Sequence, residues 1–248
     1  MSPLRQVITA ENPVATYRVS NPSRRIVEGR LSWTDLAPTE TGYEAADAAL
    51  REKMSAAPYL VVSPAYFRLE PGASKTITVR LRAAPPGLPC ARGCERRSHL
   101  VFETNAARTP LRRAGGAGDL AADIGLALST PVILRFGGAR AAAAIAGTRL
   151  LRTPEGTLEL ETHVASHGDV SAYGRVDIML KRTGEKTPIL LKRLDNIAAY
   201  ADAPARRVTA PLGVARLDPG VLEVRYIGEA EYAGLLLARR AFEVAPPD

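Results

Sequence analysis

Two cysteines and a nearby histidine are the first residues whose types and spacing could support chemistry. Cys90 and Cys94 are separated by three residues, and His99 follows five positions later. A thiol and an imidazole can form a nucleophile and base, but no orienting acid and no oxyanion loop accompany them. Zinc would need four ligands, and neither His99 nor His163 and His167 has ligand spacing to the cysteines. In an oxidising compartment Cys90 and Cys94 would close a small disulfide loop; otherwise they are two free thiols.

Two further groups of residues lack part of what their chemistry requires. The glycine-rich segment 114–118 is similar to a phosphate-binding loop, but neither a Lys followed by Ser or Thr nor a helix follows it. Asp169 and Asp177 stand near His163 and His167 and are typical of solvated carboxylates at strand edges. We therefore expect no catalytic centre, no metal site and no cofactor.

The segments around these residues have the pattern of strands. Short stretches alternate between apolar and polar residues and are separated by Pro, Gly, Asn and Asp, which is typical of half-buried strands joined by turns. In residues 76–81, for example, Ile77, Val79 and Leu81 share one face. Residues 44–54 are different, because they are rich in helix formers and poor in β-branched residues. They predict a short helix or a disordered segment.

The chain divides into two halves. Its 248 residues are more than one compact sandwich needs, and Gly137-Gly138 followed by alanines marks a boundary after Phe136. About seven strands are expected in each half, and helical βαβ units are not present in the pattern. We predict an all-β chain of two immunoglobulin-like sandwiches, residues 1–136 and 137–248.

Composition limits the partners. Lys and Arg total 33 against 26 Asp and Glu, which gives a formal net charge of +7. This excess is spread as single residues and pairs, and aromatic residues make up only 5%, whereas nucleic-acid binders concentrate charge beside stacking aromatics. No run of roughly 18 apolar residues, as a spanning helix requires, is found. We expect neither nucleic-acid binding nor membrane insertion.

One strand has an unusual setting. Ala122, Ile124, Leu126 and Leu128 share one face and follow the glycine-rich segment. The pattern fits an ordinary core strand, and it also fits an exposed strand edge with which a partner can pair, which proteins usually avoid. The pattern alone leaves both interpretations open.

A set of short stretches lies within and between the expected strands. They are Val19-Ser20-Asn21-Pro22, residues 60–64, 67–80, 87–89, 97–102 and 131–135, and Leu217-Asp218-Pro219-Gly220 in the second half. Taken together, those of the first half resemble the first domain of PapD-like pilus chaperones, with order and spacing that agree across residues 3 to 136, and the second half is similar more loosely, through its strand rhythm. The resemblance implies two sandwiches in an L- or boomerang-shaped arrangement and a protein that lends a strand instead of catalysing a reaction.

The resemblance assigns a role to the unusual strand. A pilus subunit is an incomplete sandwich without its final strand, and the chaperone fills the exposed groove with alternating side chains while its backbone completes the open ladder. By this matching Ala122, Ile124, Leu126 and Leu128 are the donors. The partners implied are pilus subunits and an outer-membrane usher.

The resemblance also assigns residues around a carboxylate anchor. Arg5 falls at the position of the family's Arg that grips the subunit's terminal carboxylate, and Arg135 at that of its inter-domain salt-bridge Arg. Pro131 stands where the family has a Lys, which leaves half of the anchor unaccounted for and removes a ladder donor. Arg97 replaces an acidic residue, so the family's acidic partner is missing there. We predict a divergent branch with different cleft chemistry.

The implied location is the periplasm. Residues 1–3 lead almost directly into a strand-like segment, so either a signal peptide has been removed and a start methionine supplied, or the protein is cytoplasmic. The alternatives are a secreted two-domain immunoglobulin-like adhesin or structural module, which would keep its own last strand buried, a cytoplasmic protein-binding sandwich, and an enzyme.

Overall fold

The chain folds into two compact units. The computed structural model describes residues 1–84, 94–106, 126–138 and 140–244. The first unit consists of Met1–Leu36 and Ala45–Gly137, and the second of Ala37–Glu44 and Gly138–Asp248. Within the described residues nearly all regular structure is strand, in two sheets per unit, with a two-stranded hairpin besides. This confirms the predicted all-β class built of two sandwiches.

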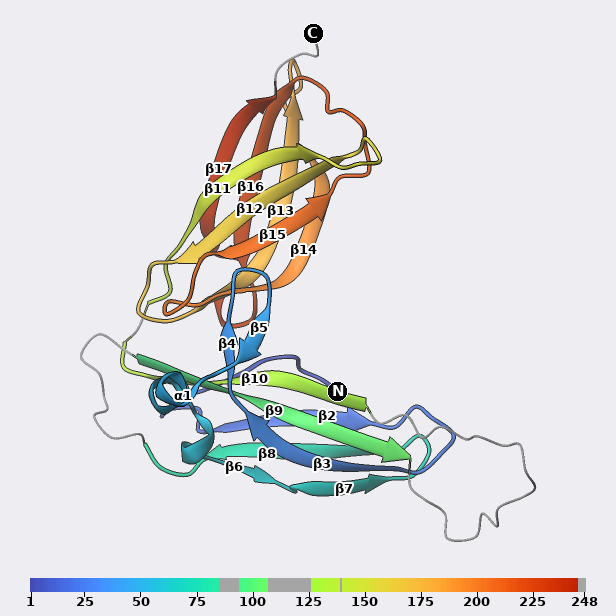
Figure 1. Ribbon diagram of the computed structural model, residues 1–248, viewed down its shortest axis with the longest axis vertical. Helices are drawn as coiled ribbons and strands as arrows, with labels where there is room; N and C mark the ends of the chain where they lie inside the picture. The colour runs from blue at the N-terminus through green and yellow to red at the C-terminus, as the bar shows by residue number, and fades with distance from the viewer. Residues whose placement is uncertain (85–93, 107–125, 139, 245–248) are drawn as a thin grey trace. The chain divides into compact units, whose positions relative to one another are not determined.

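The first unit has a five-stranded sheet in the order β1-β10-β9-β3-β7 and a three-stranded sheet in the order β2-β8-β6 (Figure 1). Strands that are neighbours in the sequence are thus divided between the two sheets, as in immunoglobulin-like sandwiches. The strands are β1 (Gln6–Ile8), β2 (Val14–Ser20), β3 (Val27–Thr34), β6 (Leu60–Ser63), β7 (Tyr66–Leu69), β8 (Ser74–Leu81), β9 (Cys94–Ala106) and β10 (Leu126–Phe136), with a 3-10 helix at Ala57–Tyr59.

Alternating burial explains how the two sheets of the first unit hold together. Along β2 every second side chain is buried, and Tyr17 is fully buried at the centre of the strand. Ile77 of β8 lies in the same core as Leu100 of β9 and Leu134 of β10, all at 0% exposure. The period-two pattern that predicts strands therefore also selects the inward face.

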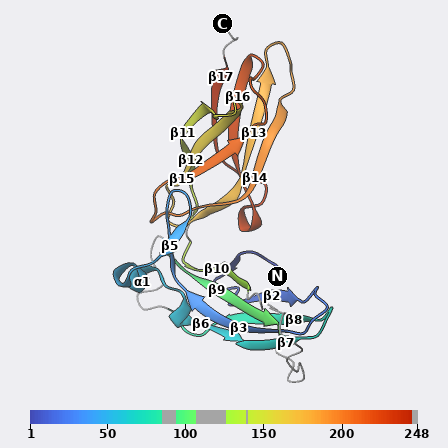
Figure 2. The same ribbon diagram turned by 45° about the vertical axis from the view of Figure 1, so that its right-hand side comes forward.

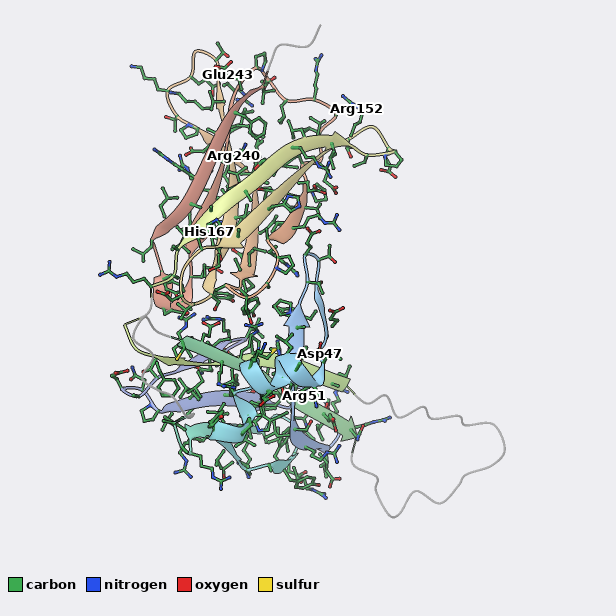
Figure 3. The ribbon with its side chains drawn as sticks, turned by 60° about the vertical axis from the view of Figure 1, so that its left-hand side comes forward. Asp47, Arg51, Arg152, His167, Arg240 and Glu243 are labelled. Atoms are coloured by element: carbon green, nitrogen blue, oxygen red, sulfur yellow. The ribbon has the colours of Figure 1, made fainter. Side chains whose placement is uncertain are left out.

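A single α-helix, α1 (Ala48–Met54), interrupts the strands among the described residues. Asp47 precedes its first turn (Figure 3). Its Oδ1 caps the helix, because it accepts a hydrogen bond from the backbone N–H of Leu50 over 2.7 Å. The helix predicted for residues 44–54 is therefore correct but starts later, since Tyr43–Ala45 forms strand β5. No helix in the described part of the chain is long and apolar enough to cross a membrane.

The second unit is a seven-stranded sandwich with sheets in the orders β11-β12-β15 and β14-β13-β16-β17 (Figure 2). The two layers enclose a separate core in which Leu160, Val176 and Val224 are fully buried. The strands are β11 (Ala143–Arg152), β12 (Leu158–Ser166), β13 (Ala172–Arg182), β14 (Ile189–Ala199), β15 (Arg206–Pro211), β16 (Gly220–Gly228) and β17 (Leu236–Val244), with a 3-10 helix at Ala230–Tyr232.

A hairpin from the first half of the sequence completes the second unit. Its strands are β4 (Leu36–Pro38) and β5 (Tyr43–Ala45). The backbone N–H of Arg207 donates to the carbonyl oxygen of Glu40 over 2.8 Å, and the hydroxyls of Tyr43 and Tyr200 are 3.3 Å apart. The chain consequently passes between the units three times, which a single boundary after Phe136 does not predict.

Candidate functional site: a free strand edge in the first unit

Strand β10 has neighbours on both sides along only part of its length. It pairs antiparallel with β9 from Leu126 to Phe136 (Figure 1), whereas β1 pairs with Val132–Leu134 alone. Within the described part of the chain, residues 126–131 therefore have a ladder on one side and a free edge on the other. Unpaired N–H and C=O groups at such an edge are a template for pairing with another chain.

The free edge exists because the N-terminal segment changes sheets. Gln6–Ile8 lie beside β10, but Ser2 pairs with Arg18 of β2 through backbone hydrogen bonds of 2.8 and 3.1 Å. At the crossing, the hydroxyl of Thr130 donates to the carbonyl oxygen of Leu4 over 2.7 Å. β1 accordingly does not continue along the part of β10 that precedes Thr130.

Leu126 and Leu128 present apolar side chains at this edge. They are 69% and 47% exposed, although they share a strand face with Val132 and Leu134, which are fully buried in the core. The face that forms core at one end of β10 is thus in water at the other end. Of the four predicted donors, these two are placed at the free edge; Ala122 and Ile124 lie outside the described residues.

Arg5 lies at the end of the free edge. It directly precedes β1, and the parallel register of Gln6 with Val132 places Arg5 level with Pro131. Burial raises the pKa of the neighbouring Tyr17, against the opposing effects of the Thr130 hydroxyl and the positive charge of Arg5. The structure therefore gathers Arg5, Tyr17 and Thr130 where the edge stops. The sequence gives little sign of the last two, since each occupies an ordinary inward position of its strand.

Pro131 lies opposite His99 of β9. Proline has no N–H, so β10 offers no backbone donor at this position. His99 is 3% exposed, and burial, followed by the charge of Arg97, lowers its pKa to about 4, while Asp35 has the opposite effect. Position 131 is therefore apolar, and its neighbour across the ladder is a neutral imidazole at pH 7.

Arg135 of β10 forms an ion pair with Glu95 of the adjacent strand β9. Its Nε donates to the Oε2 of Glu95 over 2.8 Å, and both side chains are nearly buried. The ion pair of Arg135 is thus made with Glu95 of β9, while position 97 carries Arg97 in place of the acidic residue that the resemblance implies. The role of Arg135 in orienting the two domains stays a prediction.

Cys94 begins β9 and is disulfide-bonded. Its predicted partner, Cys90, lies outside the described residues. A bonded Cys94 cannot act as a thiolate, which removes it as the nucleophile considered with His99.

The first unit is thus a sandwich with a partly unpaired strand bearing apolar side chains.

No family model matches the chain, and no curated protein matches it. Solved structures with a similar fold include the CupB2 chaperone of Pseudomonas aeruginosa, at 15% identity and a TM-score of 0.45, covering 97% of this chain and 96% of that one. The CsuC–CsuE chaperone–tip adhesion subunit complex of Acinetobacter baumannii is similar at 9% identity and a TM-score of 0.47, covering 98% and 95%. The YadV chaperone is similar at 12% identity and a TM-score of 0.46, covering 97% and 98%.

Proposed function

We propose that this chain is a chaperone for pilus subunits and that it acts by lending β10 to an incomplete sandwich. One observation carries the proposal: among the residues that the structure describes, 126–131 of β10 pair on one side only, while Leu126 and Leu128 are exposed on the face that is core elsewhere. The sequence resemblance to PapD-like chaperones supplies the class of client.

Pairing at the free edge satisfies two needs of such a client at once. The client's strand receives main-chain hydrogen bonds from β10, and its exposed groove receives the two leucines. Full burial of one leucine is worth roughly 1.5–3 kcal/mol. Leu126 and Leu128 together would contribute about twice that before the entropy of ordering the edge is subtracted. The two leucines therefore supply part of the affinity, and the main-chain hydrogen bonds of the ladder and the contact at Arg5 would supply the rest.

Arg5, at the end of the free edge, would set the register in which the client's strand pairs with β10. A client strand that continues the line of β1 runs parallel to β10, so its C-terminal carboxylate reaches Arg5. A guanidinium binds a carboxylate through two parallel hydrogen bonds. Since Pro131 supplies no charge, Arg5 is the residue that we expect to hold this carboxylate, with Tyr17 and Thr130 packed beside it.

The remaining parts of the proposal follow from the family resemblance. The protein would act in the periplasm after removal of a signal peptide, and it would deliver the bound subunit to an outer-membrane usher. No step needs a cofactor or a catalytic residue, because binding energy alone protects the client.

Co-expression with a pilus subunit that lacks its final strand tests the proposal. Leu126→Asp and Leu128→Asp place a charge in the client's groove, so recovery of a soluble one-to-one complex should fall at least tenfold. Leu190→Asp is the matched control, because Leu190 is 47% exposed on β14 of the second unit. All three variants should remain folded. Full recovery with both β10 variants would show that this edge is not the donor.

A further inference from the structure

Tyr17 of β2 has a buried hydroxyl group without a partner. Its side chain is 0% exposed, and within the described part of the chain the hydroxyl forms no hydrogen bond. The ring packs edge-on against Phe102 with the ring centroids 5.7 Å apart, so the aromatic ring alone fills the core at this position. An unpaired buried hydroxyl destabilises a fold, whereas phenylalanine has the same shape without the polar group. Packing therefore does not explain why this residue is a tyrosine.

The hydroxyl lies at the end of the free edge of β10. Thr130 and Arg5 are the neighbours that act on it, since both oppose the effect of burial on its pKa. These two residues stand where the ladder between β1 and β10 begins, one position before Pro131 and Gln6 respectively. The group that breaks the rule of hydrogen bonding is thus beside the proposed donor edge, and functional sites are where such rules are expected to be broken.

An oxygen atom of the chain itself already occupies an acceptor position at this end of the edge. The hydroxyl of Thr130 donates to the carbonyl oxygen of Leu4 over 2.7 Å. Residues 3–5 lie between the bridge of Ser2 with Arg18 and the start of β1, and they belong to no strand. The side chain of Leu4 is 55% exposed, so its carbonyl oxygen can exchange this contact for water. It marks a position at which an oxygen atom of a client can bind.

Arg5 alone leaves part of a client's carboxylate without a donor. An ionised carboxylate has two oxygen atoms and about four sites that accept hydrogen bonds. Position 131, level with Arg5, is a proline and has no N–H to donate. The hydroxyl of Tyr17, in contrast, carries a proton that no described residue accepts.

We propose that the Tyr17 hydroxyl is the second donor to the C-terminal carboxylate of the client. The carboxylate displaces the carbonyl oxygen of Leu4, accepts hydrogen bonds from Tyr17 and Thr130 through one oxygen atom, and is bound by Arg5 through the other. Because a hydrogen bond to a charged acceptor is stronger than one between neutral groups, binding offsets the destabilisation that the unpaired hydroxyl causes in the free chain. The inference rests on the proposed function, since it names a group that recognises the end of the same client.

Tyr17→Phe separates a role in binding from a role in the fold. The urea midpoint of the first unit, followed by the fluorescence of Trp33, should be unchanged or higher, whereas the affinity for the client should fall roughly tenfold. Tyr226→Phe is the matched control, because the hydroxyl of the fully buried Tyr226 donates to the carbonyl oxygen of Ile197 over 2.9 Å. This control should lower the urea midpoint of the second unit, followed by circular dichroism, and leave capture unchanged.

The client is used in two forms that differ only at the C-terminus. One is a pilus subunit that lacks its final strand and has a free C-terminal carboxylate, and the other is the same subunit ending in a carboxamide. The unaltered chain should bind the carboxylate form roughly tenfold more tightly, because the carboxamide brings no charge. Tyr17→Phe should lose affinity for the carboxylate form and change little towards the carboxamide.

The other results would overturn the assignment. Equal binding of both forms by the unaltered chain means that no carboxylate is held, and an equal loss of both in Tyr17→Phe means that the hydroxyl does not touch it. Normal capture with a lower urea midpoint means that the hydroxyl serves the fold, for example through a bound water molecule.

Leu126→Asp keeps these outcomes apart from failure of the proposed function. If it abolishes capture while Tyr17→Phe binds the carboxylate form normally, the donor edge stands and the role of Tyr17 is wrong. If the unaltered chain captures neither form, the proposed function fails and the role of Tyr17 fails with it.

Discussion

Arg135 on β10 and Glu95 on β9 lie directly opposite each other and join their charges through a hydrogen bond of 2.8 Å. Only 11% of the arginine side chain and 7% of the glutamate side chain are exposed. The attraction between two charges this deeply buried offsets the free-energy cost of removing them from water, so removing either charge destabilises the fold. The pair thus fixes the end of β10 that lies away from the free edge.

Glu95→Gln should lower the free energy of unfolding of the first unit by roughly 3–5 kcal/mol. Urea unfolding followed by the fluorescence of Trp33, the single tryptophan, measures this, since Trp33 packs against the first core. Glu103→Gln is the control, because its ion pair with Arg30 is largely exposed and should be worth less than about 1 kcal/mol. Equal effects of the two variants would contradict the role given to the buried pair.

Local pattern indicates the strands, and it indicates the helix less closely. The alternation of residues 76–81 predicts most of β8, because Ile77 and Val79 on one face of the strand are fully buried. Composition predicts α1 but places its start too early. Nothing local indicates that residues 37–44 pack with the second unit, since their partners, such as Arg207, are more than 150 positions away.

For the candidate site, too, the sequence pattern predicts which side chains share a face but not where that face lies in the fold. Alternation indicates that Leu126 and Leu128 share a face, but it cannot show that the face is in water, because that depends on where the N-terminal segment leaves β10. The crossing is fixed by the hydrogen bond between Thr130 and Leu4, residues more than 120 positions apart. Likewise, the acidic partner of Arg135 is found at Glu95 only once the β9–β10 register is known.

Arg5→Ala should weaken capture of a pilus subunit without a large change in melting temperature. Hydrogen bonds to a charged group are worth about 1.5–3 kcal/mol, so the affinity for a subunit with a free C-terminal carboxylate should fall roughly 10- to 100-fold. Arg18→Ala on β2 is the control, since Arg18 is exposed and contacts Ser74 of the same sheet. Affinity is measured by titration of purified chaperone into refolding subunit. Unaltered capture would mean that the carboxylate is not held at this position.

Stability of the first unit should fall as the pH is lowered from 6.5 towards 4.5. His99 has a pKa of about 4 in the folded chain against 6.5 ordinarily, because it is buried and faces Arg97, with Asp35 opposing. In this window the unfolded chain binds a proton that the folded chain does not, so stability is fully present above pH 6.5 and declines below it. The loss should reach at most about 3 kcal/mol.

The pH dependence of His99 can be separated from that of other groups by comparing slopes. Urea unfolding followed by Trp33 fluorescence gives the free energy of unfolding of the first unit at several pH values. Plotted against pH, this free energy should have a shallower slope for His99→Gln than for the unaltered chain. His163→Gln, in the second unit, should leave the slope unchanged. The same slope in all three proteins would mean that His99 is not the group responsible.

Asp177→Asn should destabilise the second unit at pH 7. Burial would raise the pKa of this carboxyl, but the hydrogen bond and charge of Arg193, and then Arg175, outweigh it and lower the pKa below its usual 3.8. A carboxyl of this kind stabilises the fold above its ordinary pKa, and the stabilisation is lost as the pH falls through the lowered value. The variant should therefore lose about 1.5–3 kcal/mol at pH 7.

Urea unfolding followed by far-ultraviolet circular dichroism measures the effect of Asp177→Asn. The difference from the unaltered chain should stay constant from pH 7 to pH 5, because the carboxyl is ionised throughout, and should shrink only once the pH falls below the ordinary pKa of 3.8. Asp218→Asn is the matched control, since Asp218 also binds an arginine, Arg182, over 2.7 Å but is 63% exposed. Its loss should be below about 1 kcal/mol, because solvent screens exposed pairs. If both variants unfold at the same urea concentration, burial of Asp177 does not strengthen its ion pair with Arg193.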